Sequence, residues 1–133
     1  MTGDKLPEEL RYTATHEWIR LEGDEVVIGI TDHAQSELTD IVFVDLPAVG
    51  KPVAAQASAL VLESVKTVAD VYAPVAGTVT AVNSELKAKP GLVNEDPYGK
   101  GWICRIRPAA PVDLAQFLTA EQYRSSWSSG VSP

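Results

Sequence analysis

The chain has 133 residues, of which 45% are hydrophobic and 22% are charged, as in an ordinary globular domain. That length and composition predict one domain with its own core rather than a disordered chain. The formal net charge of −7 argues against a nucleic-acid-binding protein, which needs a basic surface, and the single cysteine, Cys104, excludes an internal disulfide framework.

The first half of the chain predicts strands around one short helix. Residues 1–10 are expected to form a loose N-terminal arm. Apolar runs on either side of the turn-forming residues 22–25 predict a β-hairpin. Thr31 can cap a short helix over residues 32–38, and the β-branched and aromatic run 41–44 predicts the next strand.

The second half is predicted to continue the β structure and to finish in helices. Residues 57–73 contain neither Gly nor Pro and are rich in valine, which favours strands over a helix. The alternating segments 78–82 and 102–107 predict two more strands, with a long loop at 94–101 before the second. Two capping-box spacings predict a C-terminal helical pair within about 113–127.

Together these elements predict a mainly β domain with one short inserted helix and a C-terminal helical pair. The domain is expected to span residues 11–127, with its core at about 11–107. Residues 128–133 are expected to form a frayed tail. Trp18 and Trp102 are the expected aromatic anchors of the core.

The sequence contains no group of residues with the spacing of an active site or a metal site. The sequence has no nucleotide-binding glycine loop and no nucleophile elbow. His16 and His33 lack metal-ligand spacing, so we expect no metal; one should lie beside a core tryptophan and the other on a helix surface. Cys104 is expected in the core, because no partner base is placed beside it. No nucleophile, base and oxyanion-binding set can be assembled, so an enzyme is not expected.

One stretch stands apart, because a single lysine, Lys66, lies within valine-rich β sequence and is followed by Ala-Pro-x-x-Gly at residues 73–77. A lone lysine is ordinarily a solvated surface charge. This stretch nevertheless resembles the attachment hairpin of biotinyl and lipoyl domains, in which a lysine occupies a tight turn between two strands. No Gly, Asn, Asp or Pro lies between Ala57 and Ala69, so the turn at Lys66 rests on that resemblance.

The resemblance extends over most of the chain and becomes more specific. Five blocks are similar in order and spacing to the glycine cleavage system H-protein family: residues 12–19, 29–35, 40–47, 63–66, and 92–94 with 97–102. Among them, Glu63-Ser64-Val65-Lys66 is similar to the lipoylation motif of the family. Biotin carriers typically have Met on both sides of the lysine, and lipoyl domains of 2-oxoacid dehydrogenases usually show Asp-Lys-Ala without a His-Glu-Trp opening.

This resemblance implies a small barrel-sandwich hybrid of the lipoyl/biotinyl type that serves as a carrier. Lipoic acid would be joined to Lys66 through an amide by a lipoate-attaching enzyme, since a protonated lysine amine is a poor nucleophile at neutral pH. The carrier would shuttle an aminomethyl group from the pyridoxal-phosphate glycine decarboxylase (P protein) to the tetrahydrofolate-dependent aminomethyltransferase (T protein). It would pass electrons to dihydrolipoyl dehydrogenase (L protein).

The same resemblance implies a surface cleft that shelters the loaded arm. Thr15, Glu17, His33 and Asp70 occupy the matching positions. We hypothesise that Glu17 and Asp70 bind the aminomethyl amine through charge-assisted hydrogen bonds. The alternative is that both are solvated loop carboxylates, whose ion pairs are common and weak.

Two departures from the family pattern bear on the backbone. The family usually has Gly where this chain has Thr39, just after the predicted short helix, and commonly has Gly where Gln56 stands. A β-branched Thr at positive φ costs roughly 1–2 kcal/mol, so we expect the helix end to be rebuilt. Gln56 puts the type of its turn in doubt, and neither change touches Lys66.

Two other functions stay open at this point. A lipoate relay or storage protein would receive lipoate at the same Lys66 and donate it to other lipoyl-dependent complexes. An unmodified interaction module would keep the fold without the cofactor, although the complete motif at residues 63–66 argues against it. The chain begins with Met, lacks a transit peptide and has no apolar run of the roughly 20 residues that span a bilayer. A bacterial cytoplasmic location without membrane attachment is therefore expected.

Overall fold

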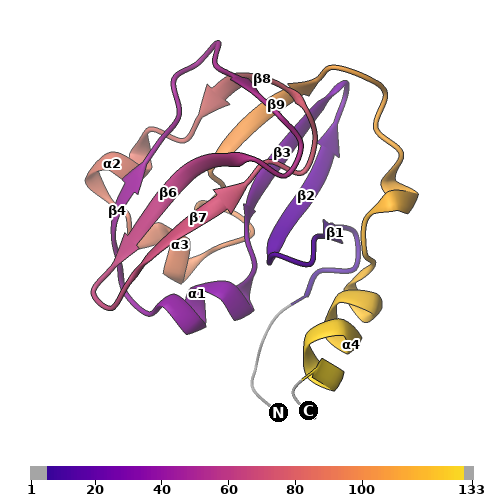
Figure 1. Cartoon of the computed structure of the whole chain (residues 1–133). Coiled ribbons are helices and arrows are strands. Elements are labelled where there is room, and N and C mark those ends of the chain that lie inside the picture. Colours follow the sequence, from indigo (N-terminus) through magenta and orange to yellow (C-terminus); the bar gives the residue numbers. More distant parts are fainter. Residues whose placement is uncertain (1–5, 131–133) are drawn as a thin grey trace.

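The computed structural model describes residues 6–130 and arranges nine strands in two antiparallel sheets, which do not close into a barrel (Figure 1). The larger sheet has the order β1 (Arg11–Tyr12), β2 (Glu17–Glu22), β3 (Glu25–Ile30), β9 (Cys104–Pro108), β8 (Gly77–Val82) and β5 (Pro52–Val53). The smaller sheet has the order β4 (Ile41–Asp45), β6 (Ser58–Ser64) and β7 (Val68–Tyr72). The prediction of a mainly β domain is confirmed.

The helices are short and lie between or after the strands. They are α1 (Asp32–Leu38), α2 (Glu85–Ala88), α3 (Leu92–Glu95), a 3₁₀ turn η1 (Leu114–Gln116) and α4 (Ala120–Gly130). The predicted inserted helix is confirmed as α1, and the predicted C-terminal pair as η1 and α4. By contrast, α2 and α3 were not predicted, and α3 includes the start of the segment that we expected to be a loop. Each is a single turn, too short to produce a helical period in the sequence.

Both ends of the described chain are more ordered than predicted. Leu6 and Leu10 are buried in a small second core cluster, so this part of the predicted arm is packed rather than loose. At the other end, Thr119 and Gln122 exchange side-chain-to-backbone hydrogen bonds of 3.0 and 3.2 Å, the reciprocal pattern of a capping box. Helix α4 then continues to Gly130, and the rest of the predicted tail, 131–133, lies outside the described residues.

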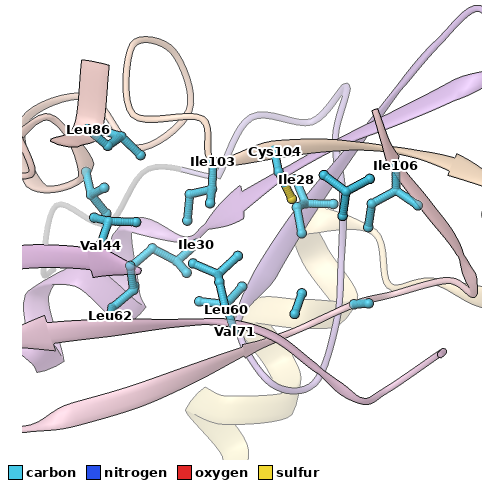
Figure 2. Packing of buried hydrophobic residues seen from close by; sticks show 14 of the residues in the cluster. Ile28, Ile30, Val44, Leu60, Leu62, Val71, Leu86, Ile103, Cys104 and Ile106 are labelled. Carbon is cyan, nitrogen blue, oxygen red and sulfur yellow. The ribbon is translucent and has the colours of Figure 1, made fainter. Parts of the chain in front are cut away.

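The main core fills the space between the two sheets. Figure 2 shows Ile30 of the larger sheet beside Leu60 and Val71 of the smaller one, with Ile28 and Ile106 continuing the same cluster. Strand side chains alternate between faces, so each sheet supplies one apolar layer. Cys104 is fully buried among these side chains, as predicted, and burial raises the pKa of its thiol to about 12.

One tryptophan anchors the second cluster more deeply than the other. Trp18 is fully buried, and its Nε1 donates a hydrogen bond to the carbonyl oxygen of Pro97 at 2.9 Å. Gly29 lies opposite it on β3, and a Cβ there would come within 2.6 Å of Trp18 Nε1, so only glycine fits. Trp102 was predicted to be an equal anchor in a strand, but β9 starts only at Cys104, and Trp102 is half-buried against this cluster.

Candidate functional site

The candidate attachment residue, Lys66, is exposed at the tip of the hairpin that joins β6 to β7. The Ser64 side chain organises this turn, because its Oγ accepts hydrogen bonds from the backbone N–H groups of Lys66 (3.2 Å) and Thr67 (3.0 Å). The Ser64 N–H also donates to the Thr67 carbonyl oxygen at 2.8 Å. The tight turn expected from the resemblance is confirmed, and a serine hydroxyl accepts the backbone hydrogen bonds that an Asn or Asp side chain accepts in other turns.

Contacts with the end of α1 hold the tip of this hairpin in place. Val65 donates its backbone N–H to the carbonyl oxygen of Asp40 at 3.0 Å. Lys66 Nζ lies 3.5 Å from the carbonyl oxygen of Glu37 on the last turn of α1. Figure 1 shows the same proximity of the hairpin end to α1. The lysine amine is thus presented to solvent beside a helix.

The outer face of the smaller sheet continues from this turn. Phe43, Glu63 and Val68 are cross-strand partners in one row, and all three are exposed. The register of β4 shifts between Ile41 and Phe43, so that both Val42 and Phe43 are exposed instead of alternating. A carboxylate between exposed apolar side chains therefore lies next to Lys66.

A cleft of about 290 Å³ lies between α1, β7 and the start of β2, and it contains all four residues predicted for the arm cleft. The structure thus brings together Thr15, Glu17, His33 and Asp70, which come from three separate segments of the chain. Other lining residues are Ile30, Leu62 and Val71, which are apolar, and His16 and Glu37, which are not. Since the Glu37 carbonyl oxygen is also next to Lys66 Nζ, the cleft opens beside the candidate attachment residue.

The two carboxylates predicted for the cleft have different surroundings. Glu17 is only 2% exposed and accepts hydrogen bonds from the hydroxyls of Thr13 and Thr15, both at 2.5 Å, and from the Tyr72 N–H at 3.2 Å. Burial raises the pKa of Glu17, although these hydrogen bonds oppose the rise. Asp70 is exposed in β7 and accepts from the Ser58 hydroxyl at 2.7 Å. Glu17 begins β2, so neither residue is a loop carboxylate and only Asp70 is solvated.

The two histidines lie next to each other, a contact that was not predicted from the sequence. His16 has the unusual φ of 73°, and its ring centroid lies 5.1 Å from that of His33, so both histidines meet in the cleft. His16 Nδ1 is 2.5 Å from the hydroxyl oxygen of Tyr123 in α4. Burial and the neighbouring His33 lower the pKa of His16. No local pattern links His16 to a tyrosine 107 positions away, so the sequence had no signal for this pair.

Thr39 and Gln56 both have the positive φ that favours glycine. Thr39 has φ 64° and ψ −152°, and Gln56 has φ 67°. The expectation of a rebuilt helix end is wrong, because hydrogen bonds hold the Thr39 backbone in place. Its N–H donates to the Gln35 carbonyl oxygen at 3.0 Å, and its carbonyl oxygen accepts from Asn94 Nδ2 at 2.8 Å.

The described part of the chain contains neither a metal-ion cluster nor a membrane-spanning helix. Among residues 6–130, no group of three or more His, Cys, Asp or Glu side chains is arranged to hold a metal ion. Within the same residues, no helix has both the length and the apolar character that crossing a membrane requires.

Comparison with known proteins connects this geometry to a family. The sequence model of the family described as "Glycine cleavage H-protein" matches residues 10–129. The chain belongs to the glycine cleavage H-protein family. This membership confirms the resemblance and the predicted carrier role in the glycine cleavage system, as a carrier subunit rather than a catalytic enzyme. The H-protein family is a lipoate-bearing one, and its members act with the other proteins of that system.

Individual relatives agree with the family match. The chain is 54% identical over 119 residues to a glycine cleavage system H protein of Acinetobacter baumannii (strain SDF), which covers 90% of this chain and 96% of that protein. It is 55% identical over 121 residues to that of Neisseria meningitidis serogroup C, covering 90% and 94%. The crystal structure of an H protein from Mycobacterium marinum matches with a TM-score of 0.84 at 40% identity, over 92% of this chain and 99% of that one.

Proposed function

We propose that this H-protein family member is lipoylated on Lys66 by a lipoate-attaching enzyme and shuttles an aminomethyl group from the P protein to the T protein and electrons to the L protein. The observation that supports this most strongly is an exposed lysine on a rigid turn, next to a cleft. The bound dithiolane would supply the redox and group-carrying chemistry. The chain itself would supply tethering, which replaces a bimolecular encounter with a local one.

The cleft has the chemistry that such an arm requires. Ile30, Leu62 and Val71 line it with apolar surface that suits an aliphatic chain, while Asp70 and Glu37 contribute carboxylates that suit an amine. Amide formation on Lys66 would remove one positive charge, so the formal net charge of −7 would become −8. Loss of that charge would leave the cleft entrance more favourable to a cationic cargo.

The exposed residues near the turn are suited to contact with partner enzymes. Ser64 would keep Lys66 in a fixed presentation, and the outer row of Phe43, Glu63 and Val68 would offer apolar contact around an acidic centre. The overall negative charge would steer partners that have basic docking faces. Val65, which is 68% exposed, would belong to the same contact surface.

Within the cleft, Asp70 would bind the aminomethyl amine directly, and Glu17 would be a buried acceptor behind it. We expect Asp70→Asn to accelerate loss of the aminomethyl group from the loaded protein about three- to tenfold, since one charge-assisted hydrogen bond is weakened. Asp45→Asn is the matched control, because Asp45 lies in the same cross-strand row as Asp70 but outside the cleft. This substitution therefore removes the same charge without changing the lining of the cleft. Equal rates for the two variants would count against this role of Asp70.

Reconstitution tests the function as a whole. Lipoylated wild-type chain should support glycine-dependent CO₂ release by the P protein and methylene transfer with the T protein, whereas Lys66→Arg should support neither. Failure of the lipoylated wild type would overturn the proposal. The relay function is the alternative, and deleting the gene distinguishes it: loss of lipoate from 2-oxoacid dehydrogenases would favour a relay, and unchanged lipoylation would favour the carrier alone.

A further inference from the structure

A chain of buried hydrogen-bonding groups connects α4 to the cleft. Thr31 caps α1 by accepting the Ala34 N–H on its Oγ1 at 3.1 Å. Thr31 Oγ1 also lies 2.8 Å from the hydroxyl oxygen of Tyr123, which in turn lies 2.5 Å from His16 Nδ1. Thr31 and Tyr123 are fully buried, and the Tyr123 ring stacks on Tyr12 with centroids 5.1 Å apart. The cleft residue His16 is thus bonded to a helix that does not line the cleft.

The positions of the protons give this chain of hydrogen bonds a direction. If Thr31 donates to Tyr123 and Tyr123 donates to His16 Nδ1, both buried hydroxyl protons have acceptors, and His16 keeps its own proton on Nε2. In the opposite direction, Tyr123 would donate to Thr31, and the Thr31 proton would have no acceptor among the contacts of the described residues. A buried donor without an acceptor is costly, so the first direction is favoured.

This direction opposes protonation of His16. A second proton could enter only at Nδ1. It would force the Tyr123 hydroxyl to turn away and would reverse the direction of both hydrogen bonds that this hydroxyl makes. The ionisable groups around His16 are His33 and Glu37 on α1, the adjacent Glu17 on β2, Asp70 on β7 and Tyr123 on α4. Burial and His33 lower the pKa of His16 and outweigh Glu37, which agrees with a neutral ring.

We propose that Tyr123 is a positioning residue that keeps His16 neutral as the Nε2–H tautomer, so that the cleft preserves its negative potential for a cationic cargo. The inference rests on the proposed role of the cleft in holding the aminomethyl arm. Retention of the cargo then depends on a hydroxyl of α4, through His16, and it weakens when acid protonates that histidine.

Two matched variants separate this role from a structural one. Tyr123→Phe keeps the ring that stacks on Tyr12 and removes only the hydroxyl. Tyr98→Phe is the control, because the Tyr98 hydroxyl accepts the N–H of Asp32, the residue after Thr31, at the same end of α1. Both substitutions remove one hydroxyl from the start of that helix, but only the first removes a partner of His16.

The first measurement uses the unlipoylated chain, so that it does not depend on the proposed function. Nitrogen-15 NMR of the imidazoles should show His16 as the Nε2–H tautomer in the wild type. Tyr123→Phe should raise the pKa of His16 by about 0.5 to 1, and Tyr98→Phe should leave it unchanged. An Nδ1–H tautomer in the wild type would overturn the proposal even if Tyr123→Phe failed to fold, and so would an unchanged titration in a folded Tyr123→Phe protein.

The second measurement follows loss of the aminomethyl group from the loaded chain as a function of pH. The loss should accelerate as pH falls through the His16 pKa, and Tyr123→Phe should move that inflection upward by the shift seen in the NMR titration. In the pH range between the two inflections, the variant should lose its cargo about three to ten times faster than the wild type. A pH-independent rate in the wild type, together with the expected NMR result, would reject the proposed function of the cleft. The hydrogen bonds from Thr31 through Tyr123 to His16 would still be supported.

Discussion

Replacing Thr39 with glycine should stabilise this protein, although the substitution removes a side chain. Thr39 has φ 64° and ψ −152°, a combination that is essentially restricted to glycine. Hydrogen bonds to Gln35 and Asn94 use only its backbone groups, so they remain in the variant. The Thr39 side chain is exposed, so its removal opens no cavity in the core and loses only the exposed hydrogen bond from Oγ1 to the Leu38 carbonyl oxygen.

The expected gain follows from two opposing contributions. Relief of the backbone strain contributes about 1–3 kcal/mol to the free energy of unfolding. The added freedom of glycine in the unfolded chain opposes it by roughly 0.5–1 kcal/mol. The net gain is about 1 kcal/mol, which for a chain of 133 residues corresponds to a rise in Tm of about 4 °C.

Urea denaturation and calorimetry of three proteins would measure this gain. Thr39→Ala is the matched control, because it shortens the same side chain but keeps a Cβ at the same positive φ. We expect the glycine variant to be more stable than both the wild type and the alanine variant, with the m-value unchanged. If glycine is no more stable than alanine, the positive φ of Thr39 is not a source of strain and the reasoning fails.

Three further predictions concern the core, the cleft carboxylate and acid stability. Gly29→Ala should destabilise the fold by about 1–3 kcal/mol in urea denaturation, since its Cβ would meet Trp18 at 2.6 Å; a neutral effect would contradict the packing described here. Glu17→Gln should lower stability by a similar amount, about 1–3 kcal/mol. The Thr hydroxyls and the Tyr72 N–H donate to different oxygens of Glu17, and the NH₂ group that replaces one oxygen of the carboxylate cannot accept a hydrogen bond; unchanged stability would show that those bonds matter little. The folded-state pKa of His16 is lowered, so the unfolded chain binds more protons and the free energy of unfolding should fall as pH drops below about 6.5. His16→Asn should show a smaller loss of stability over the same pH range, because asparagine does not titrate there and tolerates the positive φ of this position. An equal loss in the variant would refute the assignment to His16.

The hairpin at Lys66 shows how far local sequence reasoning can go. Its two strands are predictable from β-branched residues, but the turn lacks the usual Gly, Asn, Asp or Pro and was expected only from the family resemblance. A usable signal was nevertheless present, because Ser64 precedes the lysine by two positions and its hydroxyl can accept from backbone N–H groups on both following turn residues. At this position serine is as good an indicator of a turn as asparagine.

The cleft shows where such reasoning ends. Thr15, Glu17, His33 and Asp70 were expected there because they match a family pattern, and the fold does bring them together. Their environments follow from tertiary packing, however, and no sequence pattern distinguishes buried Glu17 from exposed Asp70. The contact between His16 and Tyr123 is also created only by the fold, since α4 must first dock against β1.

Single-turn helices were missed for a different physical reason. Leu86 in α2 and Val93 in α3 are each fully buried, so a tertiary contact holds each turn in place. Four residues are too few to contain a repeat, so hydrophobic periodicity cannot be measured over them. Pro90 and Gly91, a residue pair typical of turns, form the turn that separates the two helices.

The most direct test of the carrier function is the intact mass of the chain purified from its native host, beside a Lys66→Arg variant from the same host. We predict that the wild type carries the mass of one lipoyl group and that the variant does not. Absence of that mass from the wild type, in a host that lipoylates its other acceptors, would contradict the carrier function and favour an unmodified interaction module. If the Lys66→Arg variant retained the added mass, the carrier function would stand, but the assignment of Lys66 as the attachment residue would be wrong.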